Sequence, residues 1–181
     1  MHITRLAIPD VLRIVPQVFG DERGFFYESF RQDIFDAAVG RTLSFVQDNH
    51  SRSARNVLRG LHYQVRRPQG KLVRVVSGSV FDVAVDLRRS SPTCGQWVGE
   101  ILSGDNKAQM WVPEGFAHGF IVLSDSAETV YKATDYYAPE HERCIVWDDP
   151  QLAIDWSTTL APLVSDKDRR GLPFASAELF D

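Results

Sequence analysis

The sequence predicts an all-β fold, an antiparallel β-sandwich or barrel of the jelly-roll type with a few short helices. From residue 43 onward, apolar and polar side chains alternate with a period of two, the period of a half-buried strand. Eight such runs follow one another at spacings of about 10 residues, with Gly-, Ser- and Asn-containing turns between them. Helical segments do not alternate with these runs, which argues against a parallel α/β sheet.

The length of 181 residues fits one domain. We expect a single domain over residues 1–181, with an N-terminal arm and short helix at about 1–42, a jelly-roll core at about 43–147 and a C-terminal extension at about 148–181. The hydrophobic share of 44% and the charged share of 24% are typical of globular proteins and exclude a disordered or fibrous chain.

Membrane and export signals are not found in the sequence. No apolar run approaches the ~18 residues that span a bilayer, and the first residues lack the apolar core of a signal peptide. Only Cys94 and Cys144 are present, which excludes a disulfide framework and is typical of a reducing compartment. We therefore expect a cytoplasmic protein.

The helix and the strands each follow from a local pattern. A helix is expected at 29–39, because Ser29 and Gln32 match a capping box and Gly40 provides a stop. Its apolar stripe consists of Phe30, Ile34, Phe35 and Ala38. The strands are expected at 43–47, 57–65, 71–76, 80–87, 96–102, 109–112, 119–123 and 128–134.

Turns and the C-terminal tail complete the pattern. Ser77-Gly78-Ser79 is typical of a tight hairpin turn, and residues 103–106 and 124–126 are further turns. The tail from about residue 165 has the composition of a polar helix start, with Asp168 at the third helical position.

The charge of the chain is unevenly distributed. The net charge of −4 argues against a nucleic-acid-binding protein, which needs an excess of basic residues. Residues 51–81 contain no Asp or Glu but seven basic residues: Arg52, Arg55, Arg59, Arg66, Arg67, Lys71 and Arg74. Such a segment fits a small anionic ligand, for example a sugar phosphate or nucleotide, and it equally fits a solvated strand edge.

Known cofactor and nucleophile motifs are missing. The chain has no glycine-rich phosphate loop, no Cys-x-x-Cys pair and no nucleophile elbow. Jelly rolls often bind a metal through two histidines at i and i+2, but His62 is followed by Gln64, and Phe120 follows His118. We therefore expect no metal, although a site assembled from distant residues stays open.

Several polar residues lie in unusual segments. His62 and His118 lie in the glycine-containing segments 58–64 and 113–120, and Tyr131 lies in an expected strand. Taken singly, each is typical of structural packing. The pair Tyr136-Tyr137 fits either core aromatics or a surface that stacks on a base.

Taken together, these segments resemble the dTDP-4-dehydrorhamnose 3,5-epimerase family. The specific motifs are Arg-Gly-Leu-His-Tyr-Gln at 59–64 and Ala-His-Gly-Phe at 117–120, and the likeness extends over 19–26, 47–51, 57–64, 70–75, 113–120, 131–137, 147–150 and 165–169. The resemblance implies a cupin-type jelly roll, a homodimer and no metal or other cofactor. It also implies a dTDP-linked 4-keto-6-deoxy sugar as substrate, inverted at C3 and C5 by removal and return of protons on the route to dTDP-L-rhamnose.

The resemblance also implies roles for individual residues. His62 matches the base, Asp168 its partner, Tyr131 the acid and Lys71 the cation that stabilises charge on O4. Tyr137 matches a residue that stacks on thymine. The matched substrate-binding residues are Arg23, Phe26, Glu28, Gln47, Asn49, Arg59, His118, Tyr137, Glu142 and Lys167.

One structural requirement follows from these assignments. Arg59 and His62 have opposite parity along an ideal strand, so both face one pocket only if the strand bends or bulges near Gly60. Cys144 and Ser157 depart from the family pattern, and they raise doubt only about packing.

Three alternatives stay open at this point. A related enzyme would invert only C3 or only C5, or would be a ketoisomerase, because pocket shape decides which α-proton meets the base. A nucleotide-sugar binding module would bind the same ligand without catalysis. A metal-dependent cupin oxygenase would need a stoichiometric metal.

Overall fold

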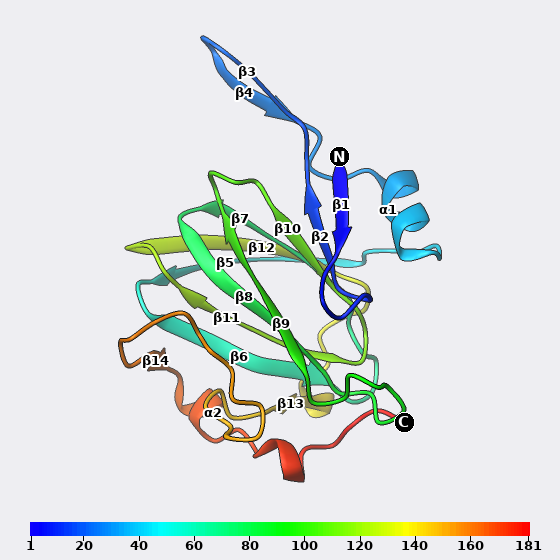
Figure 1. Cartoon of the computed structure of the whole chain (residues 1–181), viewed down its shortest axis with the longest axis vertical. Coiled ribbons are helices and arrows are strands. Elements are labelled where there is room, and N and C mark those ends of the chain that lie inside the picture. Colours follow the sequence, from blue (N-terminus) through cyan, green and yellow to red (C-terminus); the bar gives the residue numbers. More distant parts are fainter.

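The computed structural model describes all 181 residues, and its core consists of two largely antiparallel sheets that pack face to face (Figure 1). The first sheet has the order β1-β2-β10-β7-β12-β5, and the second has the order β13-β6-β11-β8-β9, with β14 also paired to β6. The first sheet consists of β1 (His2–Arg5), β2 (Leu12–Val15), β10 (Gln109–Val112), β7 (Lys71–Ser77), β12 (Ser126–Ala133) and β5 (Gln47–Ala54). The second consists of β13 (Glu142–Cys144), β6 (Val57–Gln64), β11 (Phe116–Val122), β8 (Ser79–Asp86), β9 (Trp97–Ser103) and β14 (Leu163–Val164).

From β5 to β12 the chain crosses repeatedly between the two sheets. Consecutive strands β5, β6, β7 and β8 lie alternately in the first and second sheets, and β9 to β12 cross three more times. This winding of an antiparallel sandwich is the jelly roll, so the predicted fold class is confirmed. The predicted hairpin at residues 77–79 is wrong, because β7 and β8 belong to opposite sheets. Gly78 makes the sharp crossing at a φ of 75°, where a Cβ would collide with the Ser126 carbonyl oxygen.

Three apolar clusters hold the layers together. The interior cluster takes alternate residues of the facing strands, among them Val73 and Val75 of β7 and Val80 and Ala84 of β8. A second cluster covers the outer face of the second sheet, where residues 152–177 of the C-terminal extension pack on it. A third lies between the first sheet and helix α1 (Gln32–Val39), centred on Trp111. Both faces of each sheet are therefore at least partly covered.

The N-terminal region differs from the sequence prediction in three ways. Helix α1 begins at Gln32, and the capping box does not form, because the Gln32 amide donates to Asp36 and to the Leu43 carbonyl instead. Residues 43–46 are not a strand. Leu43 and Phe45 alternate because both pack beneath α1, and regular pairing starts only at Gln47, the first residue of β5.

Six strands lay outside the predicted set. β1 and β2 add to the edge of the first sheet, which extends into the region expected to be an arm, and β13 and β14 pair with the edge of β6 that faces away from β11. The remaining two, β3 (Val18–Asp21) and β4 (Gly24–Tyr27), form a hairpin that projects far from the sandwich (Figure 1). No helix of the chain has the length and apolar character needed to cross a membrane.

Strand β6 contains the irregularity that the sequence required. Its register with β11 pairs His118 with His62 but Phe120 with Arg59, so two residues of β6 lie opposite one residue of β11. Gly60, at a φ of 123°, lies in this bulge, and the Gly60–Leu61 peptide bond is cis. Leu58 and Leu61 both pack on the outer cluster, which leaves Arg59 and His62 on the opposite, inner face. The predicted bend is confirmed.

Candidate active site

Polar side chains replace the apolar core at one end of the sandwich interior. Every second residue of β7, β8 and β11 points into the interior, and most of these residues are apolar. The inward positions also include three ionisable residues, one on each strand: Lys71, Asp82 and His118. All three are at most 9% exposed. Buried ionisable groups are costly, so their concentration at one place marks a functional site.

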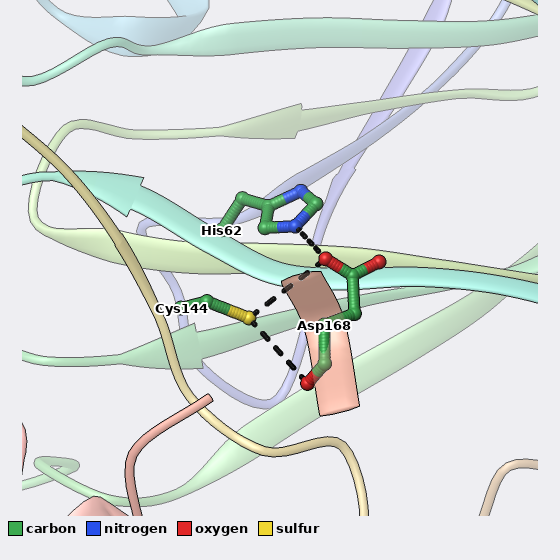
Figure 2. A group of neighbouring side chains, drawn as sticks. All are labelled: His62, Cys144 and Asp168. Carbon is green, nitrogen blue, oxygen red and sulfur yellow. Dashed lines mark hydrogen bonds and ion pairs between the residues drawn. The ribbon is translucent and has the colours of Figure 1, made fainter. Parts of the chain in front are cut away.

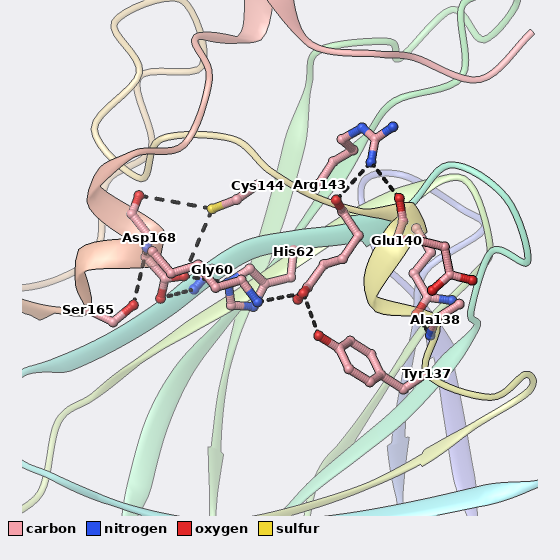
Figure 3. A network of polar contacts seen from close by, with 12 residues as sticks. Gly60, His62, Tyr137, Ala138, Glu140, Arg143, Cys144, Ser165 and Asp168 are labelled. Carbon is pink, nitrogen blue, oxygen red and sulfur yellow. Dashed lines mark hydrogen bonds and ion pairs between the residues drawn. The ribbon is translucent and has the colours of Figure 1, made fainter.

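The most defined contact in this region joins His62 to Asp168. Nε2 of His62 lies 2.6 Å from Oδ1 of Asp168, and Figure 2 shows the other ring nitrogen pointing away from the carboxylate. Asp168 comes from helix α2 (Asp166–Arg169), 106 residues further along the chain. Ser165 caps this helix by accepting from the Asp168 backbone amide at 3.1 Å, and the Gly60 amide donates to Oδ2 at 3.4 Å (Figure 3). The carboxylate is thus held by two hydrogen bonds, and the capped helix fixes the backbone that carries it.

The charge on Asp168 fixes the tautomer of His62. Burial alone raises the pKa of Asp168, but the hydrogen bond and charge of His62 and the Gly60 amide lower it more, so that the net pKa lies below its ordinary value. An ionised carboxylate only accepts, so Nε2 carries the proton and Nδ1 keeps its lone pair. Nδ1 is therefore available as a base.

Lys71 and Tyr131 have the properties of an electrophile and an acid. Burial lowers the pKa of Lys71 from 10.5 to about 8, against the opposing charges of Glu142 and Asp82. Burial and the charge of Glu142 raise the pKa of Tyr131, so its hydroxyl keeps its proton at neutral pH. Tyr131 lies opposite Val73 on β7 and packs on the interior cluster, on the same inner face as Lys71.

A second polar group borders the histidine. The Glu142 carboxylate accepts hydrogen bonds from the Tyr137 hydroxyl at 2.7 Å and from Nζ of Lys167 at 2.6 Å. These two contacts lower the pKa of Glu142 although burial opposes them. Tyr137 is also tied to β5, because its backbone amide donates to Gln47 at 2.9 Å. The exposed Tyr137 ring, 51% accessible, is free to stack on a flat ligand.

An open cleft and two unpartnered atoms mark the space for a ligand. The cleft has a volume of about 430 Å³ and is lined in part by Arg59, His62, Lys167 and Asp168. Nδ2 of Asn49 and Oδ2 of Asp82 are buried without a hydrogen-bond partner. Asn49 lies opposite Tyr131, and Asp82 bonds His118, so the two atoms belong to the same polar end of the interior. Such orphaned groups indicate a ligand that completes their hydrogen bonding.

Three of the predicted binding residues lie elsewhere in this chain. Arg23 and Phe26 are on the β3–β4 hairpin, and the Arg23 guanidinium pairs only with its neighbour Asp21. The Phe26 side chain is 72% exposed, and Glu28 is exposed in the segment after β4. The structure does not bring these three to the site of their own chain. The other predicted residues, Gln47, Asn49, Arg59, His118, Tyr137, Glu142 and Lys167, lie on or beside the polar end described above.

Sequence reasoning missed Asp82 and the position of Cys144. Asp82 is fully buried and accepts from Nε2 of His118 at 2.8 Å, forming a second histidine–aspartate pair. A charged residue within the otherwise apolar stretch 80–85 was the available signal. Cys144 lies opposite His62 on β13, with its sulfur 4.0 Å from the Asp168 carboxylate, so the expectation that this residue lies away from the matched site and affects only packing is wrong. Nothing in the sequence places it there, because the short strand β13 has no pattern of its own.

Comparison with known proteins gives consistent results. Residues 5–176 match the family model described as dTDP-4-dehydrorhamnose 3,5-epimerase. The Pseudomonas aeruginosa protein of that name is 68% identical over 180 residues, covering 99% of both chains. A crystal structure of the Legionella pneumophila enzyme in complex with dTDP-4-keto-L-rhamnose is 54% identical, with a TM-score of 0.95 over 98% of this chain and 94% of that one. A 3'-monoepimerase from Streptomyces bikiniensis in complex with dTDP-quinovose is 33% identical, with a TM-score of 0.90 over 97% of this chain and 88% of that one.

Proposed function

Because this chain belongs to the dTDP-4-dehydrorhamnose 3,5-epimerase family, it is a carbohydrate epimerase, and we propose that four of its side chains carry out the reaction. The reaction converts dTDP-4-dehydro-6-deoxy-D-glucose to dTDP-4-dehydro-L-rhamnose, a step of dTDP-L-rhamnose biosynthesis. The side chains are those of His62, Asp168, Tyr131 and Lys71. The observation that carries the proposal is the 2.6 Å contact of His62 with Asp168 at the same end of the interior as Tyr131 and Lys71.

Proton removal is the task of His62. Nδ1 takes a proton from the carbon next to the C4 ketone, and the ring becomes an imidazolium held by the charge of Asp168. The electrons move to O4 and form an enolate. Lys71 stabilises this charge, since with a pKa of about 8 it is about 90% protonated at pH 7.

Tyr131 returns a proton from the opposite face of the sugar ring. Its raised pKa keeps the hydroxyl protonated, and the phenolate that forms on donation lies near the positive charges of Arg59 and Lys167. Inversion at each carbon therefore needs one proton taken by His62 and one given by Tyr131. The cycle uses no redox step.

The nucleotide is bound by the residues that surround this core. Arg59 and Lys167 line the cleft and supply positive charge for the diphosphate. Tyr137 is held by Gln47 and Glu142, which presents its ring to thymine. Asn49 and His118 offer polar atoms beside Tyr131 and Asp82 and contact the sugar.

Deuterium exchange tests the catalytic assignment. In deuterium oxide, proton NMR of the substrate should show label at C3 and C5 with the wild-type protein. His62→Ala should lose this exchange almost completely and keep its affinity for dTDP. His50→Ala is the matched control, since His50 is 58% exposed and pairs only with Glu128. Wild-type exchange in the His62 variant would exclude this residue as the base.

The number of inverted carbons is measured in the same experiment. A single-carbon epimerase is the second candidate, because a 3'-monoepimerase shares the fold at a TM-score of 0.90. Label at both carbons supports the double epimerase, whereas label at C3 alone supports the second candidate. Pocket shape decides between them, since both reactions need the same base and acid.

The projecting hairpin supports a homodimer. Val18, Phe19, Phe25 and Phe26 are between 43% and 72% exposed on β3 and β4, an apolar surface that a soluble chain covers with a partner. Arg23 and Phe26 match substrate-binding residues but lie away from the site of their own chain. We propose that the hairpin of each chain completes the site of a second copy.

Mixing two inactive variants tests this exchange of hairpins. Arg23→Ala has a damaged hairpin and an intact base, whereas His62→Ala has an intact hairpin and no base. Subunit exchange between equal amounts should restore about a quarter of wild-type activity, since half of the dimers are hybrids with one complete site of two. No recovery would show that each hairpin serves its own chain, and a monomer in light scattering would exclude the dimer.

The compartment follows from the cysteines. Cys94 and Cys144 are both free thiols, and they are typical of a reducing environment. We propose that the enzyme works in the cytoplasm, which fractionation of the source cells would test.

A further inference from the structure

The sulfur of Cys144 lies next to the proposed catalytic pair and has no role in the reaction described above. Its Sγ is 4.0 Å from Oδ1 of Asp168, and Nε2 of His62 is 2.6 Å from the same oxygen. One nitrogen, one sulfur and one oxygen therefore lie within 4.8 Å of one another (Figure 2). We propose that His62, Cys144 and Asp168 bind a thiophilic divalent cation such as Zn²⁺, and that the bound cation blocks the base.

The donor set and its spacing fit zinc. Imidazole nitrogen, thiolate sulfur and carboxylate oxygen are the three ligand types that zinc takes, at roughly 2.0–2.3 Å from the ion. Tetrahedral geometry then places the ligand atoms roughly 3.3–3.7 Å apart. The nitrogen–oxygen separation must widen from 2.6 Å and the sulfur–oxygen separation must shorten from 4.0 Å. Both movements are below about 1 Å, within reach of side-chain rotation.

The backbone holds the three ligands in place before a cation arrives. Cys144 on β13 is directly opposite His62 on β6, so the two side chains leave the sheet on the same face. Asp168 is 3% exposed, and the Gly60 amide contacts its second oxygen. Such outer contacts orient metal ligands. His62 and Asp168 line the cleft, which provides an entry path and a fourth position for water.

Binding blocks the base through the tautomer of His62. A neutral imidazole carries one proton, so when Nε2 coordinates the cation the proton moves to Nδ1. Nδ1 is the atom proposed to abstract the sugar proton, and it then has no lone pair to offer. The thiol proton leaves to solvent as the sulfur–metal bond forms. The cation therefore acts as an inhibitor of the epimerase, and this consequence rests on the proposed role of His62.

Cobalt and zinc titrations of the full-length wild-type protein test the site. In buffer free of thiols and chelators, one equivalent of Co²⁺ should give the thiolate-to-metal charge-transfer band and the strong visible bands of a four-coordinate site. Zn²⁺ should remove these bands and stop deuterium exchange, and EDTA should restore the exchange. A wild-type cobalt spectrum without a thiolate band overturns the site, whatever any variant does.

The two free cysteines provide the matched variants. Cys144→Ala should lose the thiolate band and bind Zn²⁺ more than about 100-fold more weakly, because even outer contacts of a metal site are worth 10–100-fold. Cys94→Ala should behave as the wild type, because Cys94 lies in the loop between β8 and β9. Cys144→Ser repeats the test if the alanine variant melts early.

Two results would overturn the proposal in different ways. Equal inhibition of Cys144→Ala and wild type by Zn²⁺ would show that the sulfur is not a ligand. A thiolate–cobalt spectrum with undiminished exchange would overturn the inhibition. The spectrum does not depend on the reaction, so failure of the site and failure of the proposed function are distinguishable.

Discussion

Replacing Asp168 by Asn should separate the charge stabilisation of the His62 imidazolium from substrate binding. Asn keeps the shape and a carbonyl oxygen at the position 2.6 Å from Nε2, but it removes the charge. At this distance, a unit charge stabilises the imidazolium by roughly 6 kcal/mol with an effective dielectric constant of about 20. A neutral hydrogen bond returns about 1–2 kcal/mol of this. The remaining loss of about 4 kcal/mol corresponds to a decrease in kcat of roughly 10²–10⁴-fold.

The assay measures kcat and KM separately by the rate of deuterium entry and product formation. KM and the affinity for dTDP should change little, because Arg59, Lys167 and Tyr137 remain. Asp166→Asn is the matched control, since it removes the same charge from an exposed position of the same helix. A kcat within about threefold of wild type, or a loss confined to KM, would refute the argument that the charge of Asp168 stabilises the imidazolium formed on His62.

Three further predictions concern other groups of the chain. Tyr131→Phe should leave deuterium wash-in largely intact and lower net inversion at least about 100-fold, and parallel losses would refute the separate acid. Lys71→Met should abolish turnover while raising the free energy of unfolding at pH 7 by about 1–3 kcal/mol, as measured by urea titration. Asp86→Asn should lower the free energy of unfolding by about 2–4 kcal/mol with kcat unchanged, because the buried carboxylate accepts from Arg88, Ser91 and Thr93. Burial raises the pKa of Asp86, but these hydrogen bonds lower it more, to about 2. The stability that the carboxylate contributes is therefore lost as pH falls from about 4 to about 2, and the free energies of unfolding of the variant and the wild type should become similar there.

Periodicity predicted the strands whose side chains alternate regularly between the sandwich interior and the outer face of their sheet. β7, β8 and β10 were found within one residue at each end, since their inward residues recur at every second position. β3 and β4 were missed because Phe25 and Phe26 are both exposed, so the hairpin has no one-sided pattern within the chain. β1 and β2 are only four residues each, too short for a periodic signal.

Site residues were predicted where a motif contained them, and missed where tertiary pairing brings them in. The resemblance supplied His62 and Asp168, and the structure places their side chains in contact. Asp82 has no motif, and its pairing with His118 depends on β8 and β11 being neighbours. The division of the chain into arm, core and extension stays a prediction, although β1 and β2 show that the first sheet begins before residue 43.

The acid-free segment 51–81 shows how charge in sequence differs from charge in space. Arg55 pairs with Asp125, and Arg67 pairs with Asp135, so both cations are neutralised by residues outside the segment. Of the seven cations, Arg59 lines the cleft and Lys71 lies in the interior. The interpretation as a ligand-binding segment therefore fits Arg59 and Lys71, whereas the interpretation as a solvated surface fits Arg55 and Arg67.

Among the buried ionisable groups of the site, Lys71 has no oppositely charged group within hydrogen-bond distance. His62 and His118 each have an aspartate within 2.8 Å, whereas Lys71 is influenced by Glu142 and Asp82 only at longer range. The fall in its pKa from 10.5 to about 8 corresponds to a cost of about 3 kcal/mol for the charged form in the folded state. This cost is fully present below pH 8 and is relieved as pH rises toward 10.5, because the folded lysine loses its proton before the unfolded one.

Met at position 71 retains most of the apolar contact and removes this cost, so the variant should be more stable than wild type at pH 7 and approach it above about pH 8. Lys132→Met is the control, since Lys132 pairs with Asp48 near the surface and should change stability by less than about 0.5 kcal/mol. A Lys71→Met protein that is both inactive and less stable would mean that the ammonium supports the fold. A more stable, inactive protein would mean that the Lys71 ammonium is needed for the reaction and not for the fold. The negative charge that this ammonium stabilises then forms only on the substrate, during the reaction.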